Sequence, residues 1–137
     1  MAGPGPMQVT IEGVVHVLGE CRRFAPVLSR LGDKWTLLVI MTLRGGPRRF
    51  NQLRRGIEGV SQQMLTRTLK SLERDGLVLR TVLPANPPQV QYELTELGRS
   101  LSVPILALGD WARDHLDEIE AARAAFDRRA DGMRPGD

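Results

Sequence analysis

The chain has 137 residues, of which 42% are hydrophobic and 26% are charged, values typical of a single globular domain. Its longest apolar runs, such as residues 37–41, are too short to cross a bilayer, which argues against an integral membrane protein. The N-terminus has neither the basic nor the apolar segment of a secretory signal, so we expect a soluble intracellular protein.

The positive charge is concentrated in the middle of the chain. Between Arg44 and Arg80, nine basic residues face three acidic ones, a net charge of +6, whereas residues 99–137 carry a net charge of −2. A basic middle segment beside a more acidic flank is typical of a surface that binds a polyanion. The alternative is that these charges are scattered over the surface and only keep the protein in solution.

The first third of the chain predicts at least one helix. Residues 9–18 are apolar and rich in β-branched side chains, so helix and strand both remain open there. Pro26 suits the first turn of a helix over residues 24–31, which Gly32 ends. We divide the chain into a disordered tip, one domain and a flexible tail, at residues 1–8, 9–128 and 129–137.

Two further helices are predicted before the centre of the chain. Asp33 is a suitable N-cap for a helix over residues 34–43, whose nearly all-round apolar surface predicts a place in the middle of the core. The sequence Gly-Gly-Pro at residues 45–47 stops that helix. A short helix over residues 48–55 then follows, with Phe50 facing inward.

The strongest helix signal lies between Ser61 and Asp75. Ser61 is a good N-cap, and Leu65, Leu69 and Leu72 recur at positions i, i+4 and i+7, so one apolar stripe faces the core. The glycine that follows Asp75 provides the stop at the C-terminal end.

A hairpin and a long helix complete the predicted order. Residues 77–83 and 89–94 read as strands on either side of a proline-rich loop, which together make a β-hairpin. Thr95 opens a last helix with an extended apolar stripe, and Pro104 should kink or split it.

Residues 50–75 have the form of a helix-turn-helix, a short helix and a turn followed by a longer helix. The outer side of the second helix carries amide, hydroxyl and basic side chains and no acidic one before Glu73, whereas an ordinary solvated face mixes both signs. The residues predicted to read base edges are Gln62, Gln63, Thr66 and Arg67. The other predicted DNA contacts are Arg48, Arg49, Arg54, Arg55, Ser61, Lys70, Arg74 and Arg80. The alternative is a surface helix that merely happens to be basic.

A helix-turn-helix followed directly by a hairpin is a winged helix, so the expected fold is mainly α with α+β character and a two-stranded wing. The tip of the wing has no basic residue, and Arg80 is the only one in the hairpin. We therefore expect the wing either to touch the sugar-phosphate backbone weakly or only to brace the core.

Five segments stand out by their order and spacing, at residues 33–38, 46–53, 59–66, 72–78 and 87–98. Together they resemble the HxlR family of bacterial transcription regulators, a MarR-like group. The resemblance implies a winged-helix homodimer that binds operator DNA in the bacterial cytoplasm, associated with the nucleoid. It also implies that residues 61–75 are the recognition helix and that terminal helices form the dimer. Family members commonly carry a basic residue where Gln89 stands, which weakens the expectation of a wing–phosphate contact.

The last helix also predicts a dimer on geometrical grounds. Half-sites one helical turn apart are separated by about 34–36 Å, and one such domain offers only one recognition helix. The apolar stripe is longer than a small core requires, so its outer part, with residues 14–18, would form a twofold interface. The alternative is a core-packing helix in a monomer. The stripe consists of Leu101, Ile105, Leu108, Trp111, Ala112 and Leu116.

The single cysteine, Cys21, has two interpretations. Arg22 and Arg23 follow it and should favour the thiolate, and in several relatives a cysteine at about this place senses oxidants or electrophiles. The alternative, which we favour on the residues alone, is that Cys21 is inert.

We therefore expect a sequence-specific DNA-binding regulator, a repressor that occupies a palindromic operator as a homodimer and responds to an oxidant, an electrophile or a small ligand. A winged-helix module that binds protein and not DNA is the first alternative, and a redox enzyme built on Cys21 is the second. We expect no enzyme activity, no cofactor and no metal site, because His16 and His115 have no further ligands at suitable spacing.

Overall fold

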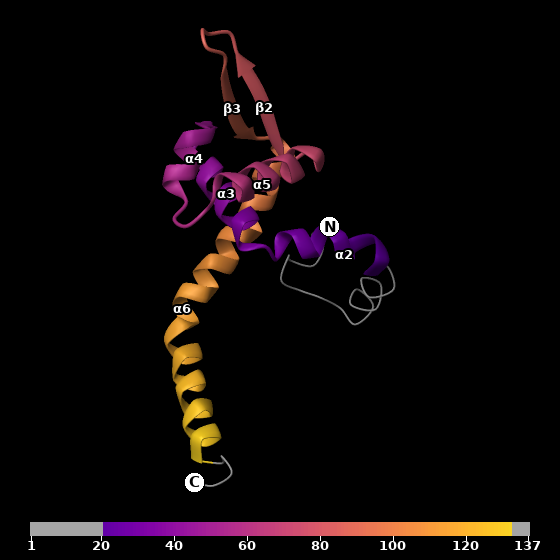
Figure 1. The fold of residues 1–137 in the computed structure, drawn as a ribbon. Coiled ribbons are helices and arrows are strands. Elements are labelled where there is room, and N and C mark those ends of the chain that lie inside the picture. The colour runs from indigo at the N-terminus through magenta and orange to yellow at the C-terminus, as the bar shows by residue number, and fades with distance from the viewer. Residues whose placement is uncertain (1–20, 133–137) are drawn as a thin grey trace.

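The computed structural model describes residues 21–132, and the predicted segment 9–18 and the tip at residues 1–8 lie outside that range. Helices form a small body from which a hairpin and one long helix project in different directions (Figure 1). In chain order the elements are α2 (Cys21–Leu31), α3 (Lys34–Arg44), β1 (Arg48–Arg49), α4 (Phe50–Gly56), α5 (Gln62–Arg74), β2 (Val78–Leu83), β3 (Gln89–Leu94) and α6 (Glu96–Gly132).

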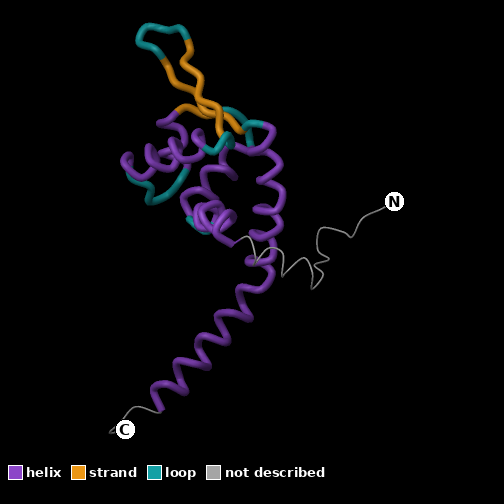
Figure 2. Tube along the Cα trace, turned by 90° about the vertical axis from the view of Figure 1, so that its right-hand side faces the viewer, coloured by secondary structure: helices purple, strands orange, loops and turns teal. Residues whose placement is uncertain are grey.

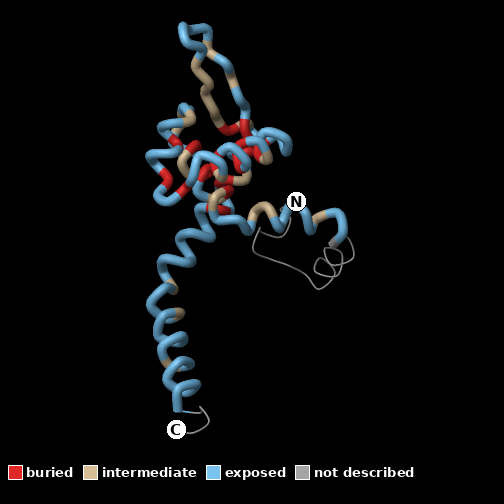
Figure 3. Tube along the Cα trace, viewed as in Figure 1, coloured by how far each residue is buried: buried red, intermediate tan, exposed pale blue. Residues whose placement is uncertain are grey.

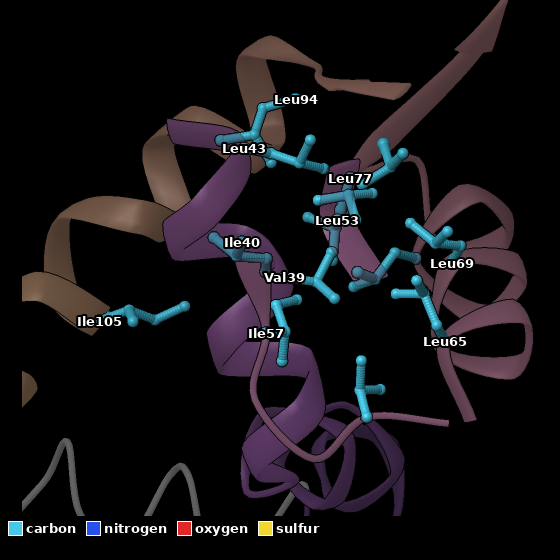
Figure 4. Packing of buried hydrophobic residues seen from close by; sticks show 13 residues of the cluster. Val39, Ile40, Leu43, Leu53, Ile57, Leu65, Leu69, Leu77, Leu94 and Ile105 are labelled. Atoms are coloured by element: carbon cyan, nitrogen blue, oxygen red, sulfur yellow. The ribbon is translucent and has the colours of Figure 1, made fainter. Parts of the chain in front are cut away.

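The helix α3 lies in the middle of the hydrophobic core, as its sequence predicts. The Asp33 side chain accepts a hydrogen bond from the Trp35 amide and caps the helix at its start. Val39 and Ile40 are fully buried between α4, α5 and the first turns of α6 (Figure 4). The whole core cluster consists of Val39, Ile40, Leu43, Leu53, Ile57, Val60, Leu65, Leu69, Leu72, Leu77, Val78, Leu94 and Ile105.

The helix α5 follows its prediction closely. Its N-cap Ser61 accepts a hydrogen bond from the Met64 amide at 3.0 Å. Leu65, Leu69 and Leu72 are exposed by 0%, 2% and 0% of their surfaces, so the three-leucine stripe is the inner face of the helix.

The sheet has one strand more than the predicted two-stranded wing. Its order is β1-β3-β2, and β1 pairs antiparallel with β3, with Arg48 opposite Tyr92 and Arg49 opposite Gln91. The prediction that Arg48 and Arg49 belong to a short helix is therefore wrong. Their extended conformation is stabilised by main-chain pairing with residues more than forty positions away, which local helix propensity does not register. The hairpin itself, β2 with β3, is confirmed.

Both helices that contain an internal proline run through it. The helix α2 begins at Cys21 and not near Phe24, so Pro26 lies inside it and not in its first turn. The helix α6 is continuous from Glu96 to Gly132 although it contains Pro104, so of the two expected effects, a kink or a split, the split does not occur (Figure 2). A proline removes one main-chain hydrogen bond, and the turns on either side of it keep theirs. The helix also includes residues 129–132 of the predicted tail.

The start of α6 is fixed against the ends of α5 and β3 by a close main-chain approach. The Thr95 hydroxyl donates to the Gly76 carbonyl at 2.6 Å and accepts from the Gly98 amide at 3.1 Å. A Cβ atom at Gly98 would overlap the Leu77 carbonyl oxygen and lie 3.1 Å from the Leu94 side chain. Only glycine fits this contact without a shift of the backbone.

Beyond this contact α6 leaves the body and its surface becomes exposed (Figure 3). Ile105 is buried, whereas Leu108, Trp111, Leu116 and Phe126 are exposed by 58%, 53%, 47% and 62%. The core therefore covers only the first part of the predicted apolar stripe. No helix within residues 21–132 combines the length and the apolar character needed to span a membrane.

We predict that Leu69→Ala lowers the free energy of unfolding by about 2–5 kcal/mol, because it leaves a cavity on the inner face of α5. The exposed neighbour provides the control, since Lys70→Ala should change the stability by about 0.5 kcal/mol or less. Chemical denaturation followed by circular dichroism measures both values. Equal effects of the two substitutions would show that the leucine stripe is not the anchor of α5.

Candidate nucleic-acid interface

The outer face of α5 gathers all four side chains that the sequence predicts to read bases. The leucine stripe turns inward, and the opposite side is exposed to solvent. The structure brings five of its side chains together around one shallow depression, in which amide, hydroxyl and cationic groups alternate. These five are Gln62, Gln63, Thr66, Arg67 and Lys70.

The end of the helix departs from this pattern at one residue. Ser71 is half-buried, whereas Arg74 in the last turn is exposed. The hydroxyl oxygen of Ser61 accepts the N-cap hydrogen bond, so this residue has its hydroxyl hydrogen and one lone pair left for an external partner.

The electrostatics of this face favour an anionic partner. The first turn of α5 has no acidic residue, and the amides at a helix N-terminus carry partial positive charge. Within the described part of the chain, no ion pair involves Arg67 or Lys70. The nearest carboxylate after the helix, Asp75, is paired with Arg30 of α2. The cationic groups of the face are therefore available to a ligand.

The arginines that precede α5 are not equivalent. Arg54 and Arg55 in the last turn of α4 are exposed. Arg49 is also exposed, and it lines a depression with Arg55 and Gln89 between α4 and the wing. In contrast, Nη1 of Arg48 donates to the Pro47 carbonyl at 2.9 Å, so this guanidinium lies over its own turn.

The wing places little positive charge near this surface. Arg80 lies in β2 opposite Tyr92 and is exposed. The tip between the strands, which projects far from the body in Figure 1, has no basic residue. The contribution of the wing to a polyanion site is therefore small.

Sequence reasoning missed Asn51 as a candidate contact. Asn51 is exposed at the start of α4 and lines the depressions on both sides of that helix, together with Arg55. It lies three and four positions before Arg54 and Arg55, so helical spacing places it beside them, and that spacing is the signal that could have found it.

Two other predictions concern residues away from α5. Cys21 is the first residue of α2, and the next two residues in the chain, Arg22 and Arg23, are exposed. The ring of His115 stacks on Trp111 with the centroids 4.5 Å apart, and His16 lies outside the described residues. No group of three His, Cys, Asp or Glu side chains suited to a metal ion occurs within residues 21–132.

Two helices joined by a tight turn, an exposed polar and cationic second helix and a hairpin behind it define a winged helix-turn-helix protein of the DNA-binding class. A family model described as HxlR-like helix-turn-helix matches residues 30–120 of the chain. The chain belongs to this family, and its curated relatives are transcriptional regulators.

Similar proteins come from several bacteria. The chain is 43% identical to the HTH-type transcriptional regulator YtfH of Escherichia coli over 97 residues, 71% of this chain and 77% of YtfH. The solved structure of ytfH from Salmonella typhimurium has a TM-score of 0.68 and 40% identity, and covers 73% of this chain and 89% of that one. The reduced form of the regulator YodB from B. subtilis has a TM-score of 0.60 and 39% identity, with 67% and 90% covered. YodB has also been solved after diamide treatment and with quinone bound.

Proposed function

We propose that this DNA-binding regulator is a repressor that binds a palindromic operator as a homodimer. The observation that supports it most directly is the exposed polar and cationic face of α5, opposite the buried leucines. Among residues 21–132, no ion pair occupies Arg67 or Lys70 of this face. A face of this composition fits the major groove, where amide and guanidinium groups reach base edges. Such a protein acts at the nucleoid in the cytoplasm.

The side chains divide into two groups by their position. Those near the start of α5, Gln62, Gln63, Thr66 and Arg67, would read bases. The others would contact the phosphate backbone, some of them only after a change of side-chain conformation, since Arg48 must first leave the Pro47 carbonyl. This second group consists of Arg48, Arg49, Arg54, Arg55, Ser61, Lys70, Arg74 and Arg80.

The exposed part of α6 supports the homodimer. Leu108, Trp111, Leu116 and Phe126 are each about half-exposed or more, which is unusual for large apolar side chains on one helix. A second copy packed against this stripe would cover them and provide the second recognition helix that a palindromic operator requires.

We predict that Arg67→Ala weakens specific operator binding by about 1–3 kcal/mol without loss of the fold, because it removes a base contact. Lys70→Ala should instead weaken binding to all sequences. It should also reduce the slope of log affinity against log salt concentration by about one, because one fewer counterion is released. Arg128→Ala, which removes an exposed charge from α6, is the control. Mobility shifts at several salt concentrations, with genomic fragments around the gene, measure the affinities. If Arg67→Ala binds as tightly as the control, Arg67 does not contact bases. If the parent protein does not bind DNA saturably, the protein-interaction alternative is favoured.

We predict that Leu116→Glu converts the dimer to a monomer and strongly reduces operator binding, because a charge enters the apolar interface. Ala121→Glu adds the same charge about 140° away around the helix and should leave the dimer intact. Sedimentation equilibrium measures the assembly state, and circular dichroism verifies the fold. A monomeric parent protein, or a dimer unaffected by Leu116→Glu, would contradict the interface.

We also propose that Cys21 senses an oxidant or an electrophile. Support comes from its position next to Arg22 and Arg23 and from the diamide-treated and quinone-bound forms of YodB.

We predict that diamide or a quinone changes operator affinity in the parent and not in Cys21→Ser. Thiol titration and mobility shifts provide the readout. An identical response of the two proteins would leave Cys21 as an inert residue.

A further inference from the structure

A further depression lies between α2, the end of α5 and the first turns of α6, away from the proposed DNA-binding face. Its volume is about 410 Å³, which lies within the range of small-molecule pockets, about 300–1,000 Å³. Its wall is mainly aliphatic, with two side chains from α2, one from the segment after α5 and two from α6. The apolar lining consists of Val27, Leu31, Leu77, Leu97 and Leu101.

The polar groups in this pocket are acceptors. Among the described residues that line it, Asp75 is the only charged one. The other polar side chain, Ser100, donates its hydroxyl hydrogen to the Leu97 carbonyl at 2.6 Å, so only its oxygen lone pairs remain free. An aliphatic wall with a carboxylate at its edge is complementary to an apolar molecule that carries a positive charge.

Asp75 already has a cationic partner, which can be replaced. It forms an ion pair with Arg30 of α2, and the side chains of Arg30 and Asp75 are exposed by 27% and 30%. Pairs that remain partly in contact with water contribute little to stability, so a second cation can compete for the carboxylate at little cost.

We propose that this pocket binds a lipophilic cation, which places its apolar part against the aliphatic wall and displaces Arg30 from Asp75. Asp75 is the C-cap residue of α5, and Arg30 lies in the last turn of α2. Occupancy therefore breaks a link between α2 and the end of the recognition helix. This gives the pocket the role of an effector site, a role that rests on the function proposed above.

Two ions of nearly equal size and shape test the charge preference. Tetraphenylphosphonium should bind the full-length protein saturably. The anion tetraphenylborate should bind more weakly by a factor of about ten or greater, and isothermal titration calorimetry measures both affinities. Asp75→Asn should remove this preference. Arg30→Ala should raise the affinity for the cation, because the competing guanidinium is gone.

The control is Asp110→Asn, which removes another exposed aspartate with an arginine partner, Arg113, outside this pocket. It should bind the cation as the parent does, and circular dichroism shows whether Asp75→Asn still folds. Equal affinity for the two ions, equal effects of the two substitutions, or no binding because a second copy covers the pocket would each overturn the proposal.

The effector role has its own readout. Tetraphenylphosphonium should change the operator affinity of the parent and leave that of Asp75→Asn unchanged. Binding with no change in operator affinity would overturn this role. Operator binding measured without any ligand tests the proposed function separately, so the two failures are distinguishable.

Discussion

The structure depends on the packing of one leucine stripe. Leu65, Leu69 and Leu72 attach α5 to the fully buried middle of α3, and this contact decides which side of α5 remains in water. Because helix geometry links the two faces rigidly, burial of the leucines is sufficient to place Gln63 and Arg67 on the surface. The proposed binding face is therefore a consequence of core packing as much as of its own residues.

How much of this could be predicted depended on whether the signal was local. Ser61 and the leucine stripe specify α5 from within thirteen residues, and the alternation of residues 89–94 specifies a strand, so both predictions are confirmed. The strand at Arg48–Arg49 depends on pairing with β3, and Pro26 lies inside a helix that begins earlier than its apolar pattern suggested. Such features depend on contacts distant in sequence, which periodicity does not contain.

The candidate interface shows the same division. Exposure of Gln62, Gln63, Thr66 and Arg67 follows from the spacing of the leucines, so the sequence was sufficient to predict it. The folded-back guanidinium of Arg48 follows from the geometry of the preceding turn, and no residue pattern predicts that. The exposed part of the apolar stripe on α6 was only half predictable, because the sequence does not show where along α6 the core ends.

The two ends of α5 are held in different ways, and this difference matters for regulation. The N-terminal end is capped within its own turn by Ser61, and Leu65 in its first turn is buried in the core. The C-terminal end meets α2 through Arg30 and α6 through Thr95, which donates to the Gly76 carbonyl. A displacement of α2 or α6 therefore reaches α5 at its C-terminal end. In the proposed dimer joined through α6, the same contact would set the distance between the two copies of α5, and a change there would alter the affinity for the proposed operator while the side chains of the α5 face stay in place.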